Sequence, residues 1–187
     1  MYFNRELRIC LDPGHGGSDN GATWGLVEED DINLSVSFYL QYELQLAGFQ
    51  NIEMTRVKDV YVALQRRVEI ASCYDAELFI SIHCDSFHYK NKKVHGQAAW
   101  VSNTASGNSF LIAGAINKEF AKRFPGNKKR GIHHADFTVL MQYRPAVLVE
   151  CEFLSNPETR KFLKEPENQR GIALCVKNAV TWYAERQ

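Results

Sequence analysis

This sequence has no excess of positive or negative charge, because its 187 residues include 22 Lys and Arg and 22 Asp and Glu. Proteins that bind nucleic acid usually present a basic face to the phosphates, so the balance speaks against nucleic acid as the main partner. The sequence also lacks an apolar stretch of the roughly 18 residues that a membrane span requires. We therefore expect neither nucleic acid binding nor membrane insertion.

Cysteine pairs with the C-x-x-C spacing are absent as well. Several cysteines lie inside apolar runs, so we expect buried free thiols instead of a disulfide framework, and folding in a reducing compartment. The segment Met1–Arg8 lacks the apolar core of a signal peptide, which predicts synthesis in the cytoplasm without an export signal. The five cysteines are Cys10, Cys73, Cys84, Cys151 and Cys175.

Strand and helix patterns alternate along most of the chain. Short apolar runs, of which Leu78–His83 is the clearest, predict buried strands. Longer amphipathic segments such as Asn33–Leu46, which ends at Gly48, predict helices. Neither a repeat nor a linker interrupts the pattern. The alternation predicts an α/β fold, a single layered domain over residues 1–187 with a mostly parallel, helix-flanked central sheet.

Strands are expected at Leu7–Leu11, Ile52–Thr55, Leu78–His83, Gln97–Val101, Phe137–Met141 and Ala146–Cys151. Helices are expected at Asn33–Leu46, Val62–Ser72, Phe110–Phe124, Pro157–Leu163 and about Arg170–Glu185. The polar segments His88–Lys93 and Pro125–Arg130 are predicted surface loops, and predicted loops also hold His95, His133 and His134. The last two histidines could border a groove.

Four ionisable residues far apart in sequence stand at the ends of predicted elements. His15 follows the first strand, Glu29 precedes a helix, and His83 and Glu150 come at or near the ends of strands. The carboxyl ends of parallel strands meet at one edge of an α/β sheet, where ligands bind. Two histidines and a carboxylate are a common ligand set of hydrolytic zinc sites, and a further carboxylate can act as general base. Together they predict a metal-dependent hydrolytic site.

Each of these residues also has a plainer explanation. The glycines around His15 could cradle a phosphate, although the G-x-G-x-x-G spacing and the lysine of phosphate loops are missing. Glu29 could be an acidic residue favoured by a helix N-terminus, and His83 could be a hydrogen-bonded core histidine. Glu150 is harder to explain, because a carboxylate in a buried strand is costly unless it is paired or functional.

Several motifs follow one another in a fixed order along the chain. The main motifs are Asp12-Pro-Gly-His-Gly-Gly17, Gly25-Leu26, Glu29-Asp-Asp-Ile-Asn-Leu34, Ile80-Ser-Ile-His83, Pro145-Ala-Val-Leu-Val-Glu150 and Phe153-Leu-Ser-Asn156. Thr55-Arg56 and Leu64-x-x-Arg67 lie between them. Together these motifs resemble the zinc-dependent N-acetylmuramoyl-L-alanine amidases of the type 3 amidase family, and the similarity runs from about Arg8 to Trp182.

The resemblance implies that His15, Glu29 and His83 hold Zn²⁺ and that Glu150 is the catalytic carboxylate. Glu28 is the rival for the second ligand position. The implied reaction is hydrolysis of the amide bond between N-acetylmuramic acid and L-alanine in peptidoglycan.

The sequence departs from the family pattern at two places. Cys84-Asp85-Ser86 replaces an Ala/Ser-Asn-Ala/Ser stretch, and Cys151-Glu152 replaces a stretch with a small residue, often glycine. Because side chains alternate along a strand, we expect Cys84 and Cys151 to point away from the metal edge.

Several biological settings and rival functions fit the same sequence. A lone catalytic domain without a signal peptide resembles a phage endolysin that a holin releases to the cell wall, and a sporulation or recycling amidase is the alternative. A zinc peptidase of related fold and an inactive peptidoglycan-binding module are the rival functions. One helix fills the segment between Val101 and His133, so we expect an open site without a plugging helix. A monomer is expected.

Overall fold

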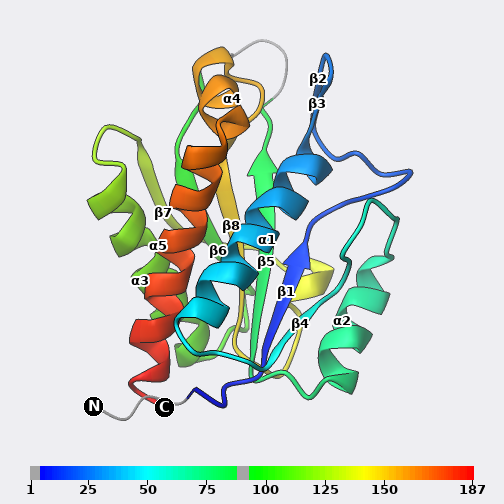
Figure 1. Ribbon diagram of the computed structural model, residues 1–187, viewed down its shortest axis with the longest axis vertical. Coiled ribbons are helices and arrows are strands. Elements are labelled where there is room, and N and C mark those ends of the chain that lie inside the picture. The colour runs from blue at the N-terminus through cyan, green and yellow to red at the C-terminus, as the bar shows by residue number, and fades with distance from the viewer. Residues whose placement is uncertain (1–4, 88–92) are drawn as a thin grey trace.

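A six-stranded sheet forms the centre of the protein in a computed structural model, which describes residues 5–87 and 93–187 (Figure 1). The strand order is β4-β1-β5-β8-β6-β7. β4, β1, β5 and β8 are parallel to one another, while β6 is antiparallel to β8 and parallel to β7. The predicted α/β fold with a mostly parallel sheet is confirmed. The strands are β1 Ile9–Pro13, β4 Ile52–Met54, β5 Leu78–Asp85, β6 Gln97–Val101, β7 Lys129–His134 and β8 Ala146–Phe153, with a separate β2–β3 hairpin at Thr23–Trp24 and Val27–Glu28.

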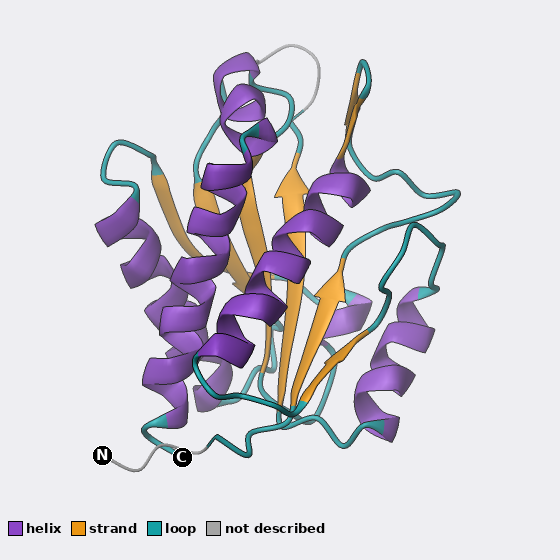
Figure 2. Cartoon of the chain, viewed as in Figure 1, coloured by secondary structure: helices purple, strands orange, loops and turns teal. Residues whose placement is uncertain are grey.

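Helices cover both faces of the sheet (Figure 2). On one face, α5 packs between α1 and α3, and on the other α2 packs with the short 3-10 helix η1. α4 follows β8, and its first turn is capped by the Asn156 side chain, which accepts a hydrogen bond from the Glu158 N–H. The bounds are α1 Glu29–Leu46, α2 Leu64–Cys73, α3 Gly107–Arg123, η1 Thr138–Leu140, α4 Pro157–Lys164 and α5 Pro166–Ala184.

Alternate side chains along the strands are buried in two separate hydrophobic cores. In β1, Ile9 and Leu11 are buried in the large core beneath α1, α3 and α5. Cys10 points the other way, and it lies in a smaller cluster with Phe79 and Leu148 beneath α2 and η1. Burial on both faces explains why the central strands are almost continuously apolar. The face with the smaller core is the face that carries the candidate site.

One predicted strand is wrong. Phe137–Met141 does not join the sheet, and its residues 138–140 form η1 instead. Val139 and Leu140 are neighbours in sequence and both are buried in the smaller core, whereas a strand buries alternate residues. β8 already has β5 and β6 on its two sides, so no position beside it is free.

One strand was missed. β7 takes in the end of the predicted loop Pro125–Arg130 and also His133 and His134, which were expected in a loop. Its sequence Lys-Arg-Gly-Ile-His-His offers a single aliphatic residue, because it is a partly exposed edge strand and needs no apolar face. His95 does lie in a loop, while the predicted loop residue His88 is outside the described residues.

Some elements begin or end at other residues than predicted. α1 begins at Glu29, four residues before its predicted start at Asn33, and β5 and β8 run to Asp85 and Phe153. All five cysteines are free and four of them are buried, as predicted, with Cys73 the exposed one. None of the helices within the described residues has both the length and the apolar character needed to cross a bilayer.

Candidate metal centre

Two glycines allow the loop after β1 to approach the candidate ligands closely. A Cβ atom on Gly14 would lie 2.2 Å from the His83 ring, and one on Gly21 would lie 2.6 Å from the Oε2 atom of Glu29. Gly21 also has a φ of +65°, a conformation that side chains disfavour. His15 itself sits at a φ of 60°. The glycine-rich loop therefore makes room for the cluster that His15 joins.

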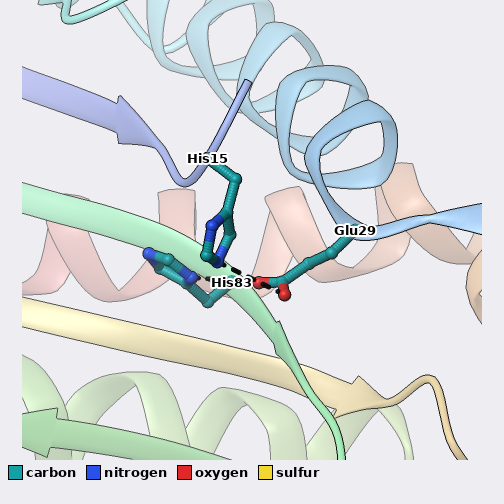
Figure 3. Close-up of side chains that lie close together, drawn as sticks. All are labelled: His15, Glu29 and His83. Atoms are coloured by element: carbon teal, nitrogen blue, oxygen red, sulfur yellow. Dashed lines mark hydrogen bonds and ion pairs between the residues drawn. The ribbon is translucent and has the colours of Figure 1, made fainter. Parts of the chain in front are cut away.

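His15, Glu29 and His83 come together at the carboxyl ends of β1 and β5 and the start of α1 (Figure 3). The Nε2 atom of His15 lies 3.4 Å from one carboxylate oxygen of Glu29, and the Nδ1 atom of His83 lies 3.0 Å from the other. One ligand atom from each residue falls within 4.8 Å of the others. Glu28 stays in β3, so Glu29 is the acid that the fold brings to the histidines.

Neighbouring donors orient the Glu29 carboxylate. Oε1 accepts hydrogen bonds from the Cys84 N–H at 3.0 Å and the Asn33 side-chain amide at 3.2 Å, and Oε2 accepts one from the Ala22 N–H at 2.8 Å. Burial acts to raise the pKa of Glu29, but hydrogen bonds from His15 and His83 outweigh it and hold the pKa well below its usual range. An ionised, fixed carboxylate between two imidazoles suits a divalent cation.

Asp19 orients His15 from the side away from the cluster. Its Oδ2 atom lies 2.9 Å from the Nδ1 atom of His15, which leaves Nε2 directed at Glu29. Burial lowers the pKa of His15, but the hydrogen bonds and charges of Glu29 and Asp19 exceed this effect and raise the pKa to about 9. A carboxylate bonded to the second nitrogen of a histidine is the usual support of a metal ligand. Sequence patterns alone did not predict this role of Asp19.

Two buried arginines hold the backbone of the same loop. Arg67 donates to the Asp12 carboxylate at 2.8 Å and to the His15 carbonyl at 2.7 Å. Arg56 donates to the Gly14 carbonyl at 2.9 Å. Thr55-Arg56 and Leu64-x-x-Arg67 were visible as family motifs without a role, and the structure shows that these arginines satisfy the carbonyls of the histidine loop.

Glu150 and His83 are register partners on the parallel strands β8 and β5. Leu148, two residues earlier, faces the smaller core, so Glu150 shares the face that α2 and η1 cover. Glu150 and His83 also line one pocket of about 390 Å³.

Within the described residues, the Oε2 atom of Glu150 has no hydrogen-bond partner. Burial, then the charges of Asp85 and Glu29, raise the pKa of Glu150 well above its usual range. Such a carboxylate is suited to accept a proton beside the cluster.

The other candidate residues lie outside the cluster. Cys84 and Cys151 belong to the large core on the opposite face, so the prediction that they point away from the metal edge is confirmed. His133 stacks on Trp100 with 4.7 Å between ring centroids, and His134 is exposed. α3, the helix between Val101 and His133, packs on α5 and does not cover the site.

A His–Glu–His centre with an adjacent unpaired carboxylate, on a mostly parallel sheet, is the arrangement of a metal-dependent hydrolase. The chain belongs to the N-acetylmuramoyl-L-alanine amidase family, whose model matches residues 9–182.

Relatives and solved structures agree with this membership. The germination-specific N-acetylmuramoyl-L-alanine amidase of Bacillus subtilis is 30% identical over 94% of this chain and 78% of its own length. The amidase LytC of the same organism is 31% identical over 94% of this chain, which spans 35% of LytC. The CwlD amidase from Clostridioides difficile, solved in complex with the GerS lipoprotein, superposes with a TM-score of 0.91 at 27% identity, covering 97% of this chain and 100% of that one.

Proposed function

We propose that this protein is a zinc-dependent N-acetylmuramoyl-L-alanine amidase, which hydrolyses the amide bond between N-acetylmuramic acid and L-alanine in peptidoglycan. The observation that carries the proposal is the register of β5 and β8, which places Glu150 beside His83 of the His–Glu–His cluster. Membership of the amidase family and the activity named for its relatives support the choice of substrate.

His15, Glu29 and His83 would hold the zinc ion. Two imidazoles and a carboxylate match its ligand preference, and three protein ligands leave a position for water. The arrangement is prepared in the protein, because Asp19 fixes the ring of His15 and three donors fix Glu29. When bound, zinc lowers the pKa of a water ligand to about 7 and polarises a carbonyl oxygen.

Glu150 would move the proton. Its carboxylate accepts a proton from water as the water oxygen bonds to the lactyl carbonyl carbon. It then delivers that proton to the L-alanine nitrogen as the carbon–nitrogen bond breaks, leaving a free stem peptide and a lactyl carboxylic acid, which loses its remaining proton to solvent. The raised pKa of Glu150, caused by burial and the nearby acids, favours holding the proton between the two steps.

Mass spectrometry of purified peptidoglycan digested by the protein tests the proposal against its rivals. We expect free stem peptides that begin with L-alanine, lost with a chelator and restored by zinc. Fragments cut inside the stem peptide would indicate a zinc peptidase. An intact sacculus with the protein still bound would indicate an inactive peptidoglycan-binding module, and either result contradicts the proposal.

The cellular setting forms a separate part of the proposal. We infer that residues 1–187 work as one catalytic domain and as a monomer on the cell wall, with the site open because α3 lies on the far face of the sheet. Lysis from within by a phage endolysin stays a prediction of the sequence, and so does synthesis in the cytoplasm without a signal peptide.

A further inference from the structure

A pocket of about 390 Å³ lies beside Glu150 and extends toward the start of β8. Its walls are largely apolar, one of them carries an aromatic ring, and a second carboxylate stands at its rim. The lining residues that matter here are Leu64, Asp136, Phe137, Val139, Leu148 and Glu150.

We propose that this pocket binds the N-acetylmuramoyl sugar ring of the substrate, and that the stem peptide extends from Glu150 in the opposite direction, toward Arg130. The inference rests on the proposed function, since it assigns the two ends of the muramoyl–alanine bond to two sides of the same site.

Proximity favours the sugar in this pocket. The lactyl ether joins the sugar ring to the scissile carbonyl through only a few bonds, so the ring must lie in the space next to Glu150. Leu64, Val139 and Leu148 offer apolar contacts for the acetyl methyl group and the C–H faces of the ring.

Phe137 offers an aromatic face to the same ligand. Its side chain is 40% exposed, and its ring lies 5.4 Å from that of Trp100, which in turn stacks on His133. The aromatic ring is therefore supported from behind and accessible in front. Aromatic rings combine apolar surface with a fixed geometry, which suits the flat side of a sugar.

Charge argues against the stem peptide in this pocket. The Asp136 carboxylate accepts hydrogen bonds from the Asn103 N–H at 3.1 Å and its side-chain amide at 2.8 Å, and from the Ser102 hydroxyl at 3.1 Å. These bonds lower the pKa of Asp136 and keep it ionised. The free carboxylates of a stem peptide would be repelled by the ionised Asp136, whereas sugar hydroxyls can donate hydrogen bonds to it.

A cation lies on the other side of Glu150. Arg130 stands over the ring of Phe153, at the carboxyl end of β8, with its guanidinium carbon 5.1 Å from the ring centroid. Gly131, the residue after Arg130, is the register partner of Ala98 on β6, and Ala98 is the partner of Glu150 on β8, so Arg130 lies two strands from Glu150 near the same level of the sheet. The Arg130 side chain makes no hydrogen bond or ion pair with another described residue, so its guanidinium donors remain available for a peptide carboxylate.

Two soluble substrates with the same peptide test this assignment. One is an N-acetylmuramoyl-peptide, and the other is a D-lactoyl-peptide, which keeps the scissile amide and lacks the sugar. We expect the wild-type protein to prefer the first by about tenfold or more in kcat/KM. Phe137→Ala should reduce that ratio to near one. Phe38→Ala removes an equally exposed ring, at 41%, from α1 on the far face and should keep the wild-type ratio.

Arg130→Gln provides a second, independent readout. We expect the wild-type protein to prefer a stem peptide with a free glutamate carboxylate over one in which that group is an amide. Arg130→Gln should remove this preference and should lower kcat/KM for the muramoyl and the lactoyl substrate alike. The zinc content of every variant is measured as a control for an intact centre. If Phe137→Ala loses zinc, Phe137→Leu is used in its place.

The outcomes separate the two levels of the proposal. Equal hydrolysis of both substrates by the wild type, or an unchanged ratio in a zinc-loaded Phe137 variant, overturns the pocket assignment alone. Failure to hydrolyse either substrate or intact peptidoglycan overturns the proposed function.

Discussion

His83 and Glu150 face the same side of the sheet from partner positions on β5 and β8. The pairing of the two strands therefore sets the spacing between the candidate metal ligand and the candidate general base. Glu29 and His15 reach the same place from a helix start and a loop, and both depend on surrounding hydrogen bonds for their orientation. Substitutions at the four residues and at their supports should have separable effects.

Replacement of His83 by alanine should abolish stoichiometric zinc binding, because the cluster then keeps a single imidazole and one carboxylate. Zinc per chain, measured by elemental analysis after dialysis, checks this. His134→Ala also removes a histidine, but an exposed one outside the cluster, and should retain the metal. Full zinc content in His83→Ala would count against the ligand assignment.

Asp19→Asn should weaken zinc binding by about 10–100-fold, since the carboxylate that orients the His15 ring is lost while all three ligands remain. Competition with a zinc chelator of known affinity measures the change. Asp31→Asn, at an exposed acid in the first turn of α1, serves as the control and should bind zinc as the wild type does. Equal affinities for the two variants would contradict a supporting role for Asp19.

Gly14→Ala should damage the centre, because the new methyl group would lie 2.2 Å from the His83 ring. We expect zinc affinity to fall by at least about tenfold and the free energy of unfolding to fall by about 1–3 kcal/mol. Gly114→Ala, in α3 with no atom within 4 Å of the added carbon, should instead stabilise the protein by about 0.5–1 kcal/mol. Chemical denaturation of the two variants, with zinc titration, measures both quantities. An undisturbed centre in Gly14→Ala would mean that the loop and the ring are not packed as described.

Arg67→Leu should lower the free energy of unfolding by about 3 kcal/mol, because it leaves the buried Asp12 carboxylate without its cationic partner and the His15 carbonyl without its arginine donor. Adding Asp12→Asn should recover part of the loss by removing the unpaired charge. Arg66→Leu, one residue earlier on α2, breaks only an exposed pair with Glu69 and should change stability by less than about 1 kcal/mol. Equal losses at the two arginines would contradict the role given to Arg67.

Sequence patterns predicted the fold wherever burial determines the pattern. β5 and β8 lie in the sheet centre with both faces covered, and their apolar runs are unmistakable. β7 was missed because its edge position requires pairing but no apolar face. The segment at η1 was misread for the opposite reason, since its apolar residues fill a core without forming a strand.

The ionisable residues of the candidate site could be predicted from the sequence, whereas the residues that orient them could not. His15, Glu29, His83 and Glu150 are ionisable residues at the ends of predicted elements, which made them visible. The Asp19 and Arg67 contacts depend on the path of a loop that passes through a positive φ at His15, and local sequence does not specify that path. The pocket at Phe137 was hidden because the segment was assigned to a strand.

The most direct test of the central claim measures zinc content and turnover on the same preparation of Glu150→Gln. The substitution keeps the shape of the side chain and removes its ability to take up a proton. We expect one zinc ion per chain, as in the wild type, and a loss of peptidoglycan hydrolysis of about 10²–10⁴-fold. Hydrolysis near the wild-type rate by the zinc-loaded variant would contradict the assignment of Glu150 as the group that moves the proton.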